Sequence, residues 1–296
     1  MKHVILVNPV SGNKKGEKYG TNIQKLLKKY HIQAEMVLSE YPKHLTKVAH
    51  DMANTQTCRF YSVGGDGTLN EIVSGIVGTN SEIVVIPSGT GNDFVKSISD
   101  YRSMRKIVIN AIDTKSSKVD VLKIGRHGYC INILNVGFDS MVAKNVDKFR
   151  KVPFISGKMK YNLAIFYTLL SNKNFKLKIK MDNMAIKGRF TLTAIANGKY
   201  YGGGICPCPD ANVSDGILDT CTVGPTEVIK KIFLLPKYQK GKHTDHPLVH
   251  IKKAKDVRIV STRKFPVSID GEIIYSNRLH IQVLPQAVNI VKIKKK

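Results

Sequence analysis

The stretch Tyr61–Glu71 constrains this chain more than any other, because it reads Tyr-Ser-Val-Gly-Gly-Asp-Gly-Thr-Leu-Asn-Glu. The apolar run at 59–63 predicts a strand, and the spacing of apolar residues over 69–77 predicts a helix. Glycines between them accept tight turns and let backbone N–H groups approach an oxyanion, and the helix adds its positive N-terminal end. The sequence therefore predicts a phosphate-binding turn, with Asp66 placed to hold a Mg²⁺ water and Thr68 placed to hydrogen-bond a phosphate oxygen. A Gly-rich turn by itself is also typical of an ordinary strand-to-helix connection.

Two further strand-to-helix turns have the same character. The apolar run His3–Val7 leads into Asn-Pro-Val-Ser-Gly at 8–12, and the run Ile83–Ile86 leads into Pro-Ser-Gly-Thr-Gly-Asn-Asp-Phe at 87–94. The first of these turns lacks the Gly-Lys-Ser/Thr ending of a Walker A loop. With another strand at 34–38, strands alternate with helices in this part of the chain. We therefore predict a doubly wound, Rossmann-like α/β domain over 1–121, with ligand-binding turns at the carboxyl ends of its strands.

The pattern changes to strands from about residue 122. Over Phe175–Met181 apolar residues alternate with lysines, which is the period of two expected of a half-buried strand. Similar runs at 128–136, 190–196, 218–223, 256–261 and 265–270 predict an antiparallel β-sandwich domain over 122–284, interrupted by one helix near 158–170. The last apolar strand, within 285–296, is a candidate to return to the first domain.

The charge balance indicates an anionic partner. There are 47 Lys and Arg residues against 22 Asp and Glu residues, which gives a net charge of +25. No nucleic-acid-binding module is recognised, so we expect a nucleotide and an anionic membrane surface rather than nucleic acid. A lysine-rich genome is an equally good explanation of the charge alone. Five cysteines without framework spacing favour a reducing, cytoplasmic compartment, and no apolar run approaches the roughly 18 residues of a membrane span.

The Gly-Gly-Asp-Gly-Thr pentapeptide and the turns at 8–12 and 87–94 resemble the nucleotide-binding motifs of the lipid kinase superfamily. That superfamily contains diacylglycerol kinases and sphingosine kinases, and also NAD kinases. The resemblance extends to the Gly-Gly-Gly loop at 202–204 and to Asp-Gly-Glu at 270–272, so it covers nearly the whole chain. It implies an ATP-dependent kinase with the ATP site in the cleft between the two domains.

The resemblance also assigns roles to individual residues. It implies nucleotide binding by Asn8, Pro9, Ser11, Gly12, Ser39, Gly64, Gly65, Gly67, Thr68, Asn70, Glu71, Thr90, Asn92 and Asp93. Mg²⁺ would be held, directly or through waters, by Asp66, Asp93 and Asp120. Ser39 is equally typical of a helix-capping serine, and Asp120 of an edge-strand aspartate facing water.

Two further roles come from the same resemblance. Glu272 would be the general base that takes the proton from a lipid hydroxyl, alongside Asp66 and Asp120 as catalytic residues. A structural Mg²⁺ would bind the Asp215 side chain and the backbone oxygens of Asn212 and Ile217, although the same stretch is typical of a turn that opens a strand.

We therefore expect a bacterial-type lipid kinase that associates peripherally with membranes, with diacylglycerol as the first candidate acceptor. A homodimer is a further expectation from the family. Two alternatives stay open: a kinase for NAD or another soluble acceptor on the same scaffold, and a non-catalytic nucleotide-binding regulatory protein.

Overall fold

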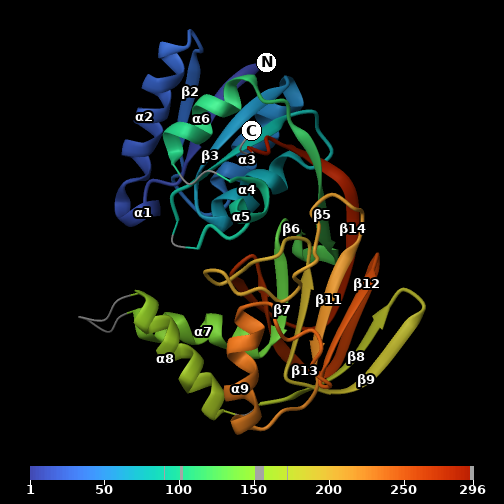
Figure 1. Ribbon diagram of the computed structural model, residues 1–296. Coiled ribbons are helices and arrows are strands. Elements are labelled where there is room, and N and C mark those ends of the chain that lie inside the picture. Colours follow the sequence, from blue (N-terminus) through green and yellow to red (C-terminus); the bar gives the residue numbers. More distant parts are fainter. Residues whose placement is uncertain (90, 101–102, 151–156, 172, 294–296) are drawn as a thin grey trace. The chain divides into compact units, whose positions relative to one another are not determined.

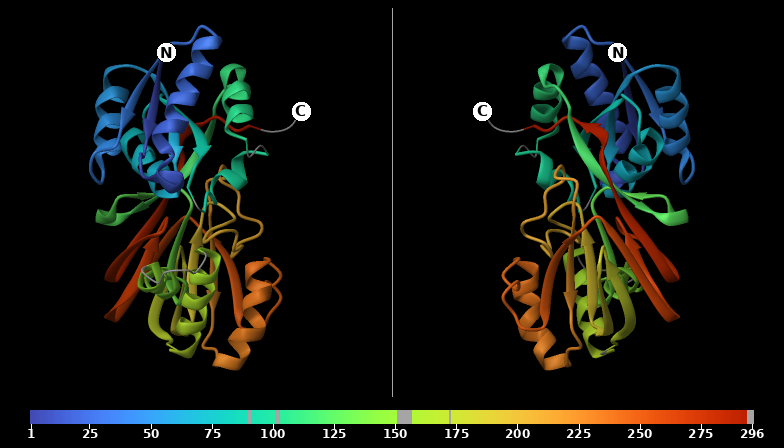
Figure 2. Two further views of the ribbon diagram at one scale, coloured as in Figure 1. Left: turned by 90° about the vertical axis from the view of Figure 1, so that its left-hand side faces the viewer. Right: turned by 90° about the vertical axis from the view of Figure 1, so that its right-hand side faces the viewer.

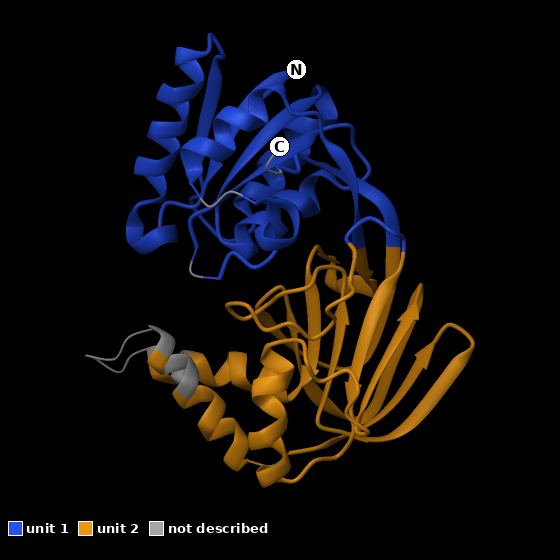
Figure 3. Ribbon diagram, viewed as in Figure 1, with its two compact units in different colours: residues 1–121, 213–216, 284–296 blue, residues 122–212, 217–283 orange. Residues whose placement is uncertain are grey.

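The computed structural model describes residues 1–293 except 90, 101–102, 151–156 and 172, and it divides into two compact units (Figure 3). Unit 1 holds Met1–Val121, Val213–Gly216 and Leu284–Lys296. Unit 2 holds Leu122–Asn212 and Ile217–Val283. Two strands, β5 (Ser117–Ile124) and β14 (Glu272–Ile290), contribute residues to both units.

Unit 1 is built on a parallel sheet. Its strands follow the order β2 (Ala34–Leu38), β1 (Lys2–Val7), β3 (Cys58–Gly64), β4 (Glu82–Pro87) and the end of β14. Every residue of β3 is buried, as expected of a central strand covered on both faces. This confirms the predicted α/β class.

Helices cover both faces of this sheet (Figures 1 and 2). On one face, Ile5, Tyr61 and Val84 pack against Ile23 of α2 (Gly16–Lys29) and Ile107 of α6 (Met104–Asp113). The other helices of this unit are α1 (Ser11–Lys14), α3 (His44–Thr55), α4 (Asp66–Ile76) and α5 (Val95–Ile98). The α3 and α4 helices pack so closely that a Cβ added to Gly75 would lie only 2.5 Å from the Thr46 carbonyl oxygen.

Unit 2 is a sandwich of antiparallel strands. The first half of β13 (Asp256–Ile269) pairs with β8 (Phe175–Met181), which pairs with β9 (Met184–Phe190). The last residues of β13 pair instead with β7 (Ile133–Gly137), followed by β10 (Leu192–Ala196), β11 (Leu218–Val223) and β12 (Val249–Ala254). A register shift between Val260 and Phe265 separates the two halves. The β-sandwich prediction is confirmed, with 256–261 and 265–270 forming one strand rather than two.

The predicted strand at 128–136 is wrong, because it forms two short strands, β6 (Tyr129–Cys130) and β7. The break has a side-chain cause. The Asp270 carboxylate accepts hydrogen bonds from the backbone N–H groups of Ile131 (2.8 Å), Asn132 (3.1 Å) and Ile133 (3.1 Å). These donors are therefore satisfied by a carboxylate instead of a neighbouring strand.

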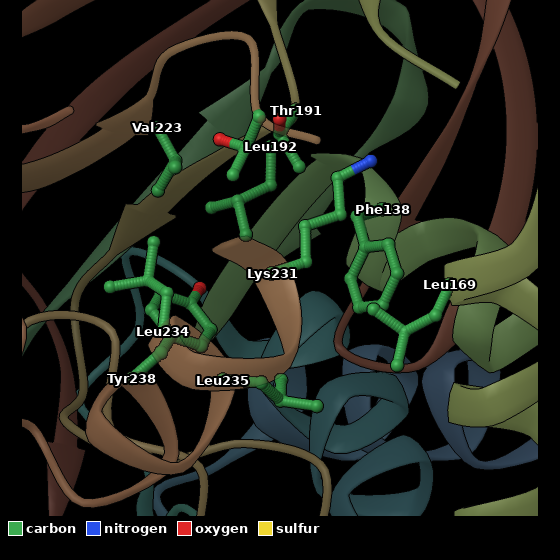
Figure 4. Close-up of a pocket in the computed structure, with 10 residues that line it drawn as sticks. Phe138, Leu169, Thr191, Leu192, Val223, Lys231, Leu234, Leu235 and Tyr238 are labelled. Carbon is green, nitrogen blue, oxygen red and sulfur yellow. The ribbon is translucent and has the colours of Figure 1, made fainter. Parts of the chain in front are cut away.

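The helix predicted near 158–170 is confirmed, but it is not the only helix of this unit. The described residues hold α7 (Phe138–Arg150), α8 (Gly157–Leu170) and α9 (Val228–Gln239). They enclose an apolar pocket lined by Phe138, Leu169, Leu192, Leu234 and, among others, Lys231 (Figure 4). Burial lowers the pKa of the Lys231 amine. None of the helices that the structure describes is long and apolar enough to cross a membrane.

A buried carboxylate joins these helices. Asp139 on α7 is 7% exposed, and its Oδ2 accepts a hydrogen bond of 2.9 Å from the Tyr238 hydroxyl on α9. The Tyr201 and Tyr238 hydroxyls lie 3.4 Å apart. Burial raises the pKa of Asp139 to about 6, although hydrogen bonds from Tyr201 and Tyr238 oppose the shift. Folding therefore shifts the ionisation of Asp139 towards the neutral acid, compared with an ordinary aspartate.

We predict that Asp139→Asn stabilises the protein at high pH. Because the folded pKa of Asp139 lies above its ordinary value of 3.8, its favourable contribution is complete below that value and is lost as pH rises through about 6. Keeping the charge buried costs at most about 3 kcal/mol. Asparagine stays neutral and still accepts from Tyr238, so urea unfolding should show a gain of about 1–3 kcal/mol near pH 8 that shrinks towards pH 5.

The exposed carboxylate of Asp245, replaced by asparagine, is the control and should show no such pH-dependent gain. A gain for Asp139→Asn that is independent of pH, or a loss at high pH, would contradict the burial argument.

Candidate active site

Three loops meet at the carboxyl ends of the unit 1 strands, because neighbouring parallel strands end at the same edge of the sheet. The Asn8 N–H donates to the Val63 carbonyl at 3.0 Å, and the Ser88 N–H donates to the Gly64 carbonyl at 3.0 Å. Ser39 follows β2 at the same edge, where its N–H donates to the Val7 carbonyl at 2.8 Å. The predicted turns are thus brought side by side.

The loops after β3 and β4 touch through glycine backbone. A Cβ added to Gly89 would lie 2.5 Å from the Gly65 Cα and 3.1 Å from the Gly65 nitrogen. A Cβ on Gly64 would lie 2.2 Å from the Thr68 hydroxyl oxygen. Any side chain at Gly89 would push the two loops apart, so glycine is a steric requirement here. Gly67, in the first turn of α4, is exposed.

Asp66 ties these two loops together. Its carboxylate accepts hydrogen bonds from the backbone N–H groups of Asp93 (3.1 Å) and Phe94 (3.2 Å). Asp93 is 2% exposed, and its Oδ1 lies 2.5 Å from the Lys96 ammonium group. A Cβ added to Gly91 would lie 3.1 Å from Asp66 Oδ2 and 3.4 Å from Asp93 Oδ2, so the two carboxylates flank the same backbone position.

The first loop is fixed to the third. The Ser11 hydroxyl donates to the Asn8 carbonyl at 2.8 Å and lies 3.0 Å from the Ser88 hydroxyl. Asn8 Oδ1 accepts from the Val10 N–H at 3.1 Å, across Pro9. Gly12 has a φ of +58°, and a Cβ there would lie 2.8 Å from the Ser88 carbonyl oxygen. All three loops therefore form one connected structure.

The remaining predicted nucleotide-binding residues lie on the third loop and on α4. Asn92, with a φ of +50°, accepts from the Gly89 N–H at 3.0 Å and donates back to the Gly89 carbonyl at 2.5 Å. Asn70 and Glu71 lie on α4, where Glu71 Oε2 is buried and has no hydrogen-bond partner within the described part of the chain. Thr90 lies outside the described residues.

Asp120 on β5 is fully buried, so the alternative of a water-facing edge aspartate is wrong. Its Oδ2 accepts from the Gly216 N–H and its Oδ1 from the Gln286 N–H, each at 2.7 Å. Asp120 thus fastens two distant chain segments to unit 1. Its part in a Mg²⁺ network stays a prediction.

The predicted structural cation loop also stays a prediction. Asn212 and Asp215 are exposed, and Ile217 is half-buried. In the described residues, no group of three or more His, Cys, Asp or Glu side chains is arranged to hold a metal ion. The predicted site relies on backbone oxygens, which that observation does not test.

Glu272 follows a two-residue hairpin turn. Asp270 and Gly271 both have positive φ, 45° and 96°, and Ile269 pairs with Glu272 across the turn. This is the backbone that Asp-Gly hairpins prefer. Glu272 is exposed, whereas its neighbour Asp270 accepts the three N–H groups described above. The sequence singled out the Asp-Gly turn, but the inward direction of Asp270 could not be deduced from it.

The chain is similar to several named proteins and to solved structures. "Putative lipid kinase YtlR" of Bacillus subtilis is 27% identical, over 96% of this chain and 97% of that protein. "Putative lipid kinase SAS0691" of Staphylococcus aureus is 28% identical, over 79% of this chain and 76% of that protein. Two crystal structures from Bacillus anthracis str. Sterne, described as a putative diacylglycerol kinase and as a diacylglycerol kinase, match 98% of this chain with TM-scores of 0.78 and 0.75. The matches extend over 95% and 96% of the two crystallised chains, at 22% and 20% sequence identity, and show that the fold is shared.

Two family models account for nearly the whole chain. Residues 2–124 match the diacylglycerol kinase catalytic domain. Residues 132–292, more than half of the chain, match the YegS C-terminal NAD kinase beta sandwich-like domain. With the Gly-rich loops and the sandwich in the same order, the chain belongs to the diacylglycerol kinase catalytic-domain family.

Proposed function

We propose that this protein is an ATP-dependent lipid kinase, which transfers the γ-phosphate of ATP to a lipid hydroxyl and has diacylglycerol as its first candidate acceptor. The observation that carries the proposal is the contact between Gly65 and Gly89. Neither residue has a side chain, so the loops present backbone at this contact, beside the start of α4. Such a surface suits the phosphates of a nucleotide.

The chain's own residues suit a nucleotide bound with Mg²⁺. Asp66 and Asp93 flank the backbone at Gly91, and Asp66 is held by two backbone N–H groups. When bound, Mg²⁺ would offset negative charge on the transferring phosphoryl group. Asp66, Asp93 and Asp120 are the carboxylates that we propose for it. Ser11 and Asn8 order the loop that would contact the nucleotide.

Glu272 is the base that activates the acceptor hydroxyl in the proposed reaction. Phosphoryl transfer depends mainly on positioning and charge, with one base near the attacking hydroxyl. Glu272 takes the hydroxyl proton, and the oxygen attacks the γ-phosphorus in line as the bond to ADP breaks. Asp270 holds the hairpin that carries Glu272, because it fastens the turn to the backbone of 131–133.

The acceptor is taken from a membrane in this proposal. The net charge of +25 favours peripheral association with an anionic bilayer on the cytoplasmic side. Among lipid alcohols, diacylglycerol comes first because of the family to which the chain belongs. A panel of diacylglycerol, sphingosine and NAD, offered with labelled ATP, tests the choice. Label in NAD alone would replace the lipid by a soluble acceptor.

We predict that Gly89→Ala weakens the binding of ATP–Mg²⁺ at least about tenfold, because the added methyl group separates the loops after β3 and β4. Isothermal titration calorimetry measures the affinity, and circular dichroism checks folding. Gly188→Ala is the matched control, since its nearest neighbour would lie at 3.8 Å, an ordinary contact. Unchanged ATP affinity in a folded Gly89→Ala protein would remove the proposed nucleotide site.

We predict that Glu272→Gln lowers kcat for lipid phosphorylation by about 10²–10⁴-fold, because the base is lost while its size is kept. ATP affinity should change little. The measurement is transfer of labelled phosphate to diacylglycerol in mixed micelles. Asp245→Asn, which removes another exposed carboxylate of unit 2, should retain activity. Full turnover by Glu272→Gln would exclude Glu272 as the base.

A further inference from the structure

A groove of about 550 Å³ lies within unit 2, between α7, α8 and the strands β8, β13 and β14. Its size falls in the range of sites that hold one small ligand. None of the residues that line it belongs to the set predicted for nucleotide, metal or proton transfer. The groove therefore has no role in the proposed reaction as derived so far.

Three lysines enter this groove from separate elements. Lys144 lies on α7, Lys173 follows α8, and Lys264 lies on β13. None of the described residues that line the groove is acidic, and within the described chain none of the three ammonium groups forms an ion pair. Like charges that converge on one groove repel one another, and a bound anion would relieve that repulsion.

The rest of the lining is apolar and aromatic. Tyr167, Leu170, Phe175 and Tyr275 form walls of the groove, and Lys144 Nζ lies 5.1 Å from the centroid of the Tyr275 ring. Leu170 is 62% and Tyr275 48% exposed. Large apolar side chains that are exposed around a basic groove are typical of a binding surface rather than of ordinary surface. A free phosphate would leave these walls uncovered.

We propose that this groove binds an anionic phospholipid, with the phosphate among Lys144, Lys173 and Lys264 and an acyl chain along the apolar walls. The choice of a lipid among phosphate-bearing amphiphiles rests on the proposed function. The site would hold unit 2 at an anionic membrane. The lipid bound there is not the acceptor whose hydroxyl Glu272 deprotonates. A zwitterionic headgroup would place a quaternary ammonium among the lysines and is disfavoured.

The test is calorimetric titration of the full chain with dioctanoyl phosphatidic acid, below its micelle concentration. The triple variant Lys144→Gln, Lys173→Gln, Lys264→Gln should bind at least about tenfold more weakly than the unchanged chain. The matched control replaces Lys176, Lys178 and Lys180 by glutamine, which removes the same charge from exposed positions of β8. This control should keep its affinity within about twofold.

A second variant guards against misfolding of the triple variant. Leu170→Gln changes an exposed wall residue and keeps every charge, so it should weaken phosphatidic acid binding about threefold. Glycerol 3-phosphate and dioctanoyl phosphatidylcholine should bind the unchanged chain much more weakly than phosphatidic acid.

Three results would overturn the inference: equal losses in both lysine triples, equal affinity for glycerol 3-phosphate, or equal affinity for phosphatidylcholine. The readout requires no turnover. If phosphatidic acid binds but no phosphoryl transfer is found, the proposed kinase function is rejected and the groove remains supported as a phospholipid site. Transfer to diacylglycerol without groove-dependent binding would do the reverse.

Discussion

The contact between Gly65 and Gly89 is the constraint on which the candidate site depends. It exists because β3 and β4 are parallel neighbours in register, so that the loops after them leave the sheet at the same edge. Because neither residue has a side chain, the loops meet backbone to backbone at this contact. Asp66 then fixes their spacing through the N–H groups of the next loop. The geometry of the sheet, rather than any one reactive side chain, brings these two glycine loops together.

Three aspartates have a common physical role in holding this architecture. Asp66, Asp120 and Asp270 each accept two or more backbone N–H groups from segments distant in sequence. A carboxylate fixed in this way supplies negative charge in a defined place, and it also maintains a loop. Its removal would therefore disturb backbone as well as charge. Asparagine variants with a folding measurement separate these two effects better than alanine variants do.

Much of this could be predicted from the sequence wherever one pattern dominates. The strands at 34–38, 175–181 and 218–223 form with the expected bounds, because their apolar runs or alternation leave one choice. The failures have long-range causes. The break in 128–136 is made by Asp270, which lies far along the chain, and α9 contains Pro236, which local rules place at helix ends. The direction in which a carboxylate points, and the strands that pair within a sandwich, are not set by the local sequence.

The excess of lysine shows the same distinction between composition and arrangement. On β8, Lys178 pairs across the sheet with Lys187 and Lys176 with Arg189, and these side chains project from an exposed face into solvent. There the charges can diverge, and water and salt screen them. Lys144, Lys173 and Lys264 are exposed too, but they line one groove that has apolar walls. Net charge does not distinguish lysines spread over an exposed face from lysines that line one groove. Their arrangement does, because only charges gathered around one groove can act together on a single anion.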